Sequence, residues 1–208
     1  MDPEKKFKPT ILKVEKEKGF KVDDCFPNVL KKVKKDGGSA QYGWQIWESK
    51  HYIEAEFHCV WKDKRNAFRD FTPKSGGDKQ IMFIPIDNKK WEMEVVPSKR
   101  ISICDNEIVD CLLSVLAKRD IAYQKTSRAN PNGTEGFMAL EMQEMFLECQ
   151  QLLQSMLILN KESGDNCLCG SGKIFKTCHL PIIEMCMSDV VFRIEKLCKA
   201  VKEGKVNL

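Results

Sequence analysis

The chain has 208 residues, of which 42% are hydrophobic, and its formal net charge is +4 at pH 7. This composition is typical of a folded core and excludes an intrinsically disordered protein, and the length suits one large domain or two small ones. So small a charge does not by itself indicate a nucleic-acid partner.

No membrane or export segment is recognisable in the sequence. It contains no run of about 18 apolar residues, and the beginning MDPEKKFKPT lacks the apolar stretch of a signal peptide. We therefore expect a soluble, cytoplasmic protein without membrane association. Because no export signal accompanies the ten cysteines, we expect them to be mostly reduced thiols.

The first predicted element is a helix that begins near Cys25. Two aspartates directly before Cys25 are N-cap candidates, and Gly37 with Gly38 provides a stop signal. The lysine-rich residues 1–20 are interpreted as a solvated face, with a short strand as the alternative. Helical spacing predicts a buried stripe that consists of Val29, Leu30 and Val33.

A β-hairpin is predicted next. Alternating apolar residues indicate a strand at Ile53–Trp61, with His58 on its more polar face. If Lys62–Asn66 forms the loop, the chain returns as a strand at Ala67–Thr72, and symmetric pairing sets His58 opposite Asp70. A slip of one residue would place these two side chains on opposite faces.

A cysteine at a helix start, followed by a histidine and an aspartate on adjacent strands, can form a catalytic triad. This order resembles the transglutaminase-like and papain-like cysteine enzymes, with HCVW and RDFTP similar to their strand motifs. The resemblance implies that Cys25 is the nucleophile, His58 the base and Asp70 the residue that orients the base. The alternative is a buried cysteine beside a structural His–Asp pair.

The second half of the chain changes to helical spacing after a third strand at Gln80–Ile84. A helix is expected from Asp105 to about Tyr123, followed by a loop. A coiled-coil-like seam then runs from Met138 to Leu159, and similar spacing returns near the C-terminus. This pattern favours an antiparallel helix pair within a monomer over a homodimer. The residues of the two stripes are Met138, Met142, Met145, Cys149, Leu152, Met156 and Leu159, and then Val190, Ile194, Leu197 and Val201.

The strongest motif is a C-x-C-x8-C-H array formed by Cys167, Cys169, Cys178 and His179. Four such ligands, folded back by a Gly-Ser-Gly turn, suit tetrahedral Zn²⁺ with no open position, so the zinc would be structural. A phosphate-binding loop is rejected, because Ile174 stands where a Ser or Thr would follow the lysine. The array closely resembles the SEC-C motif, found at the C-terminus of the bacterial secretion ATPase, which implies a zinc knuckle that contacts partner proteins.

Together these patterns predict an α+β protein with a small antiparallel sheet and a packed N-terminal helix, followed by helices that carry the knuckle. The expected divisions are a cysteine-enzyme domain at 1–100, a helical region at 101–160, and the knuckle with a C-terminal helix at 161–208. The preferred function is a cysteine-dependent amide hydrolase or acyl transferase that acts on a protein or peptide. The alternative is a non-enzymatic zinc-containing adaptor, and nucleic-acid binding is a weaker third option.

Overall fold

The computed structural model divides the chain into two compact units. The described residues are 8–86, 95–129, 138 and 140–205. The first unit comprises residues 1–48 and 54–91, and the second comprises residues 49–53 and 92–208. Within the described residues, no helix combines the length and apolar character needed to cross a membrane.

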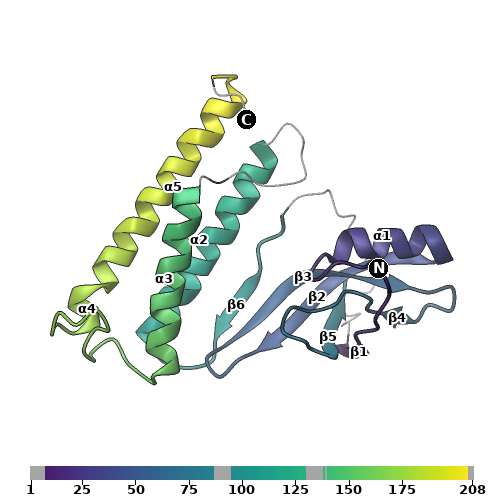
Figure 1. Cartoon of the computed structure of the whole chain (residues 1–208), viewed down its shortest axis with the longest axis horizontal. Helices are drawn as coiled ribbons and strands as arrows, with labels where there is room; N and C mark the ends of the chain where they lie inside the picture. Colours follow the sequence, from purple (N-terminus) through teal and green to yellow (C-terminus); the bar gives the residue numbers. More distant parts are fainter. Residues whose placement is uncertain (1–7, 87–94, 130–137, 139, 206–208) are drawn as a thin grey trace, which may run out of the picture. The chain divides into compact units, whose positions relative to one another are not determined.

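The first unit is an antiparallel sheet with one helix, α1 (Cys25–Asp36), over the strands β2 and β3 (Figure 1). The strands, in chain order, are β1 (Thr10–Lys13), β2 (Ser39–Glu48), β3 (Tyr52–Lys62), β4 (Phe68–Arg69) and β5 (Gln80–Pro85). Their spatial order is β1-β5-β2-β3-β4. Val14 forms a bridge with Asp70, and the backbone N–H of Glu15 donates to Asp70 O at 2.8 Å. The residues directly after β1 therefore pair with the residue directly after β4, so the two edges of the sheet meet.

The two faces of this sheet carry separate cores, because successive residues of a strand point to opposite faces. One core lies under α1 and consists of Cys25, Val29, Cys59, Trp61 and Phe71. The other consists of Leu12, Val60, Ile81 and Phe83. On that second face Gly43 is required: a Cβ there would lie 2.5 Å from Cζ of Phe83, so only glycine lets the ring rest against the strand.

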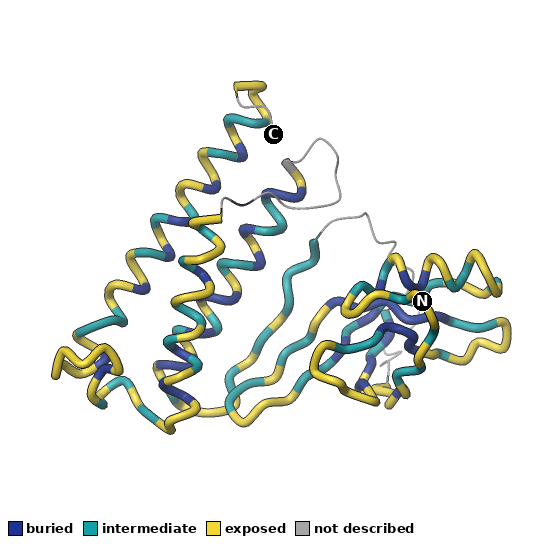
Figure 2. The backbone as a smooth tube through the Cα atoms, viewed as in Figure 1, coloured by how far each residue is buried: buried dark blue, intermediate teal, exposed yellow. Residues whose placement is uncertain are grey.

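The second unit is built from helices. They are α2 (Glu107–Ala129), α3 (Leu140–Ile158), the short α4 (Phe175–Cys178) and α5 (Leu180–Lys202), preceded by the strand β6 (Lys99–Ser102). Helix α2 packs along both α3 and α5. Figure 2 shows α5 with a buried and an exposed face, as its apolar periodicity requires. The ion pair between Arg100 and Asp120, at 2.7 Å, ties β6 to α2.

The predicted helix at Cys25 is confirmed, but its buried stripe differs from the expected one. Leu30 is 52% exposed, whereas Asn28 is buried. The Asn28 side chain accepts a hydrogen bond from Lys21 N at 3.0 Å and donates one to Lys21 O at 2.8 Å. These bonds satisfy the amide inside the unit, so a polar residue takes a place that the apolar pattern assigned to Leu30.

The methionine-rich seam forms part of the helical core, as predicted, but α2 is longer than expected. It continues past Tyr123 to Ala129, and the buried Thr126 donates its hydroxyl to Ala122 O at 3.0 Å, which satisfies that side chain inside the helix. Leu159, the residue directly after α3, is exposed and does not join the buried seam that was predicted for it. The core joins α2, α3, α5 and Phe175 of the knuckle, so the predicted helical region and knuckle segment share one unit.

Candidate metal centre and the predicted catalytic residues

A tight loop at residues 165–179 brings four potential metal ligands together. An antiparallel bridge joins Asn166 to Ile174, and the backbone N–H of Cys167 donates to Lys173 O at 2.9 Å. Between these pairs the chain reverses through Gly170 and Gly172, whose φ values are +76° and +74°. Other residues rarely adopt this left-handed conformation, so the Gly-Ser-Gly sequence is what allows so short a turn.

The four ligand atoms have the spacing that a tetrahedral metal site needs. The Sγ atoms of Cys169 and Cys178 are 3.5 Å apart, and Nδ1 of His179 lies 3.0 Å from Sγ of Cys167 and 3.3 Å from Sγ of Cys178. All four atoms lie within 4.8 Å of one another. A tetrahedron with Zn–S bonds of ~2.3 Å has S···S and S···N edges of about 3.8 and 3.5 Å, so the donor set fits such an ion with little adjustment.

The electrostatic environment of the loop favours the thiolate form of the exposed Cys169. Hydrogen bonding with Ser171 lowers the pKa of Cys169 to about 6, and the two side chains lie 3.1 Å apart. Burial raises the pKa of Cys167 to about 11, but a coordinated cation deprotonates such a thiol outright. Sequence reasoning treated Ser171 only as a turn residue, although its Oγ also lies 3.2 Å from Sγ of Cys178. Ser171 therefore supports two of the ligands.

The loop is anchored to the helical core. The buried ring of Phe175, at the start of α4, belongs to the same core as the helices. The carboxylate of Glu107, the first residue of α2, pairs with Lys176 at 2.6 Å and accepts a hydrogen bond from the Ser163 hydroxyl. His179 links α4 directly to α5. An ion held here would therefore fix the start of α5 as well as the loop.

In the first unit, the structure brings His58 and Asp70 together. Nε2 of His58 lies 3.1 Å from Oδ2 of Asp70, and both side chains are buried. The hairpin register differs from the predicted one by two residues, since Trp61 pairs with Arg69. A shift of two keeps both side chains on one face and sets them diagonally, which still lets them meet. The predicted return strand is also shorter, because β4 consists of only Phe68–Arg69.

Cys25 lies on the other side of the sheet from this pair. The Cys25 side chain, at the start of α1, packs against Cys59. The ring of His58 packs on Phe83 of the opposite face, with ring centroids 6.3 Å apart. Burial raises the pKa of Cys25 to about 12, which disfavours the thiolate that a nucleophile needs. Cys25 packs on the face of Cys59, and the side chains of His58 and Cys59 point to opposite faces because the two residues are adjacent in one strand. The structure therefore does not bring the Cys25 thiol to the His58 ring.

The buried His–Asp pair belongs to a polar cluster that the sequence analysis did not anticipate. The ammonium of Lys74 lies 3.2 Å from Oδ2 of Asp70, 3.4 Å from Nε2 of His58 and 3.0 Å from Oε1 of Gln45. Burial alone would raise the pKa of Asp70, but the hydrogen bond with His58 and the charges of His58 and Lys74 hold it below its usual value. Lys74 follows a proline in an irregular segment, so no periodicity could have placed it here.

Comparison with known proteins bears on the metal loop alone. A family model for the SEC-C motif matches residues 165–181, which include all four ligands. No curated protein and no solved structure matches the chain. The chain is therefore a mixed α/β protein with an antiparallel sheet and a helical region that carries a SEC-C motif with a Cys₃His cluster. The catalytic interpretation of Cys25, His58 and Asp70 stays a prediction.

Proposed function

We propose that the protein is a non-enzymatic adaptor whose helical unit is stabilised by a structural Zn²⁺ and binds another protein. The observation that carries this proposal is the convergence of four protein ligands, Cys167, Cys169, Cys178 and His179, within 4.8 Å. Three thiolates and one imidazole are a donor set typical of structural zinc. Four protein donors leave no position for a substrate, so the role of the ion is to hold the loop in shape.

The surface around the loop supports a protein partner. Ile182 and Met185 stand on the exposed side of the first turns of α5, and Met185 is 66% exposed. Leu168 and Ile174 of the loop itself are also exposed. Exposed large apolar side chains of this kind are a common feature of protein interaction sites. The resemblance of the loop to a motif that contacts partner proteins points to the same role.

The geometry favours the adaptor over the cysteine-dependent hydrolase. A hydrolase needs its thiol beside the base, and the sheet lies between Cys25 and His58. His58 and Asp70 are themselves buried, and with Lys74 they form an internal polar cluster in this conformation. The adaptor requires no rearrangement of the described residues.

A site-specific crosslinking experiment tests the partner surface. A photoreactive amino acid is placed at Met185 and, as the control, at Ile121, an exposed apolar position on α2. We expect a defined protein to be crosslinked from position 185 alone, and to be lost when Ile182→Asp or Cys178→Ser is added. Identical products from both positions, or products that neither substitution changes, would contradict the proposal.

A further inference from the structure

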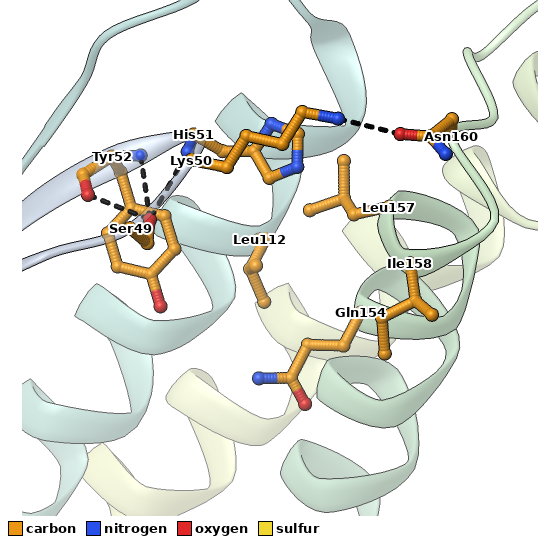
Figure 3. Close-up of a pocket in the computed structure, with 9 residues that line it drawn as sticks. All are labelled: Ser49, Lys50, His51, Tyr52, Leu112, Gln154, Leu157, Ile158 and Asn160. Carbon is orange, nitrogen blue, oxygen red and sulfur yellow. Dashed lines mark hydrogen bonds between the residues drawn. The ribbon is translucent and has the colours of Figure 1, made fainter.

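A cavity of about 500 Å³ lies within the second unit, and none of its described lining residues belongs to the metal loop (Figure 3). Its apolar lining comes from α2 and the end of α3. Leu112 is 1% exposed and Leu157 is buried, whereas Ile158 is 77% exposed and forms an apolar edge. The aromatic ring of Tyr52 lies on the opposite side of the cavity from Ile158 in Figure 3. A flat or branched hydrocarbon group fits between such walls.

The polar end of the cavity is formed by the turn at residues 49–53. The hydroxyl of Ser49 accepts hydrogen bonds from the backbone N–H groups of His51 and Tyr52, at 3.2 and 3.0 Å, and donates one to Tyr52 O at 2.8 Å. These bonds hold the turn, so Lys50 and His51 are presented in a defined position. The ammonium of Lys50 reaches across the cavity and donates to Oδ1 of Asn160 at 2.7 Å.

The charge of this lining is positive. Among the described residues, no aspartate or glutamate lines the cavity, and the hydrogen-bond partner of Lys50 is the neutral amide of Asn160. An ammonium binds a carboxylate more strongly than it binds an amide oxygen. The amide of Gln154 lies at the other end of the cavity, where it has no hydrogen-bond partner among the described residues. An amide can donate to, or accept from, a second polar group of a ligand.

We propose that this cavity binds a small carboxylate with an aromatic or branched apolar body. The body lies between Tyr52 and Ile158 over Leu112, and the carboxylate pairs with Lys50 in place of Asn160. The same chemistry is present in a free aromatic acid and in the last residue of a peptide chain. The site is separate from the metal loop, so it does not depend on the zinc-stabilised adaptor function.

The test is a titration of the full-length protein, followed by NMR, with 3-phenylpropionate and with N-acetylphenylalanine. We expect saturable shifts of the Gln154 side-chain amide signals, with a dissociation constant in the millimolar range that is usual for fragments of this size. The neutral 3-phenylpropanamide should bind at least about fivefold more weakly, because it lacks the charge that pairs with Lys50. Binding of both acids indicates that the site recognises the shared carboxylate and apolar body. Binding of 3-phenylpropionate alone indicates a free aromatic acid, and binding of N-acetylphenylalanine alone indicates the last residue of a peptide chain.

Two pairs of variants assign the effect to the cavity. Lys50→Met should weaken binding of 3-phenylpropionate about five- to tenfold, whereas Lys199→Met, on an exposed lysine of α5, should leave it unchanged. Ile158→Ser should weaken it about threefold, and Leu159→Ser, on the next and also exposed residue, should not. The proposal is overturned if neither acid saturates by about 20 mM, if acid and amide bind equally, or if Lys50→Met binds like the wild type.

Discussion

The metal loop and the triad predicted in the sheet unit were both expected to bring functional side chains together, and they differ in how far apart their residues lie along the chain. The four ligands of the loop lie between Cys167 and His179, and one glycine-containing turn and one short helix are enough to gather them. The predicted triad spans Cys25 to Asp70 and depends on a helix, a hairpin register and the choice of a sheet face. The loop assembled as expected, whereas Cys25 and His58 lie on opposite faces.

Short-range and long-range inferences from sequence therefore have different strengths. A ligand array with fixed spacing carries its own geometry, because few backbone paths connect its members. A pattern of alternating residues gives the two faces of a strand but does not reveal which face a distant helix covers. Helix α1 covers the face of Cys59 and Trp61, and this choice alone separates Cys25 from His58.

Removal of the metal should have the largest effect, and it should be confined to the second unit. Chelation, or the Cys178→Ser substitution, should lower the unfolding free energy of the helical unit by about 3 kcal/mol or more, since a structural zinc site supplies folding energy. All four tryptophans fall within the residue range of the first unit, so fluorescence reports the sheet, while circular dichroism at 222 nm reports mainly the helices. The midpoint of the helical transition at 222 nm should fall, whereas the midpoint of the tryptophan fluorescence transition should stay unchanged.

Cys104→Ser, at an exposed thiol outside the ligand set, is the matched control and should leave both melts unchanged. Equal shifts of the helical and tryptophan transitions on chelation would show that the loop stabilises the whole chain. That result would contradict the separation between the two units.

Replacing Asp70 with asparagine should destabilise the first unit by about 2–4 kcal/mol, because Lys74 would be left buried without its carboxylate. The pKa of Asp70 is lowered in the folded state, so its contribution is present above the unfolded value of about 3.9 and is lost as pH falls through the lower folded value. Urea unfolding followed by tryptophan fluorescence should therefore show a flatter acid dependence in the variant. Asp78→Asn, at an exposed position, should behave like the wild type.

Alkylation rates should show whether Cys25 is a nucleophile. Since burial raises its pKa to about 12, Cys25 should react with iodoacetamide at pH 7.5 at least about 100-fold more slowly than the exposed Cys104. Mass spectrometry of timed digests measures both rates in one sample. Fast labelling of Cys25 with a bell-shaped pH profile would instead support the cysteine-enzyme prediction and would require a conformation in which the thiol meets His58.

Much of the element pattern was predictable from local signals. The long strand through His58 and the strand that begins at Gln80 follow from alternation, and α1 begins at Cys25 as predicted, although its N-cap residue Asp24 makes no side-chain hydrogen bond with the helix start. The strand β1 was assigned to a solvated segment because the first twenty residues are rich in lysine. In the structure only Leu12 of its four residues is buried. Its partner β5 lies some seventy residues later, and no local pattern reveals such a pairing.

The functional residues also divide into those that local spacing predicts and those that meet only in the folded chain. The ligands were predictable from type and spacing, and the pairing of His58 with Asp70 survived an incorrect register because the error was two residues. Lys74 and Gln45 could not be predicted, since they meet only after β2 and the segment beyond β4 are folded together. Lys50 and Asn160 are similarly distant in sequence, and only the fold places both at one cavity.

X-ray absorption at the zinc edge measures directly whether one structural zinc ion is held by Cys167, Cys169, Cys178 and His179. Protein purified without chelator should contain about one equivalent of zinc, in a shell of three sulfurs at ~2.3 Å and one nitrogen at ~2.0 Å. Cys178→Ser should remove a sulfur from that shell or the metal altogether. Less than about half an equivalent of zinc, or a shell dominated by oxygen, would show that these four residues do not hold a structural zinc ion.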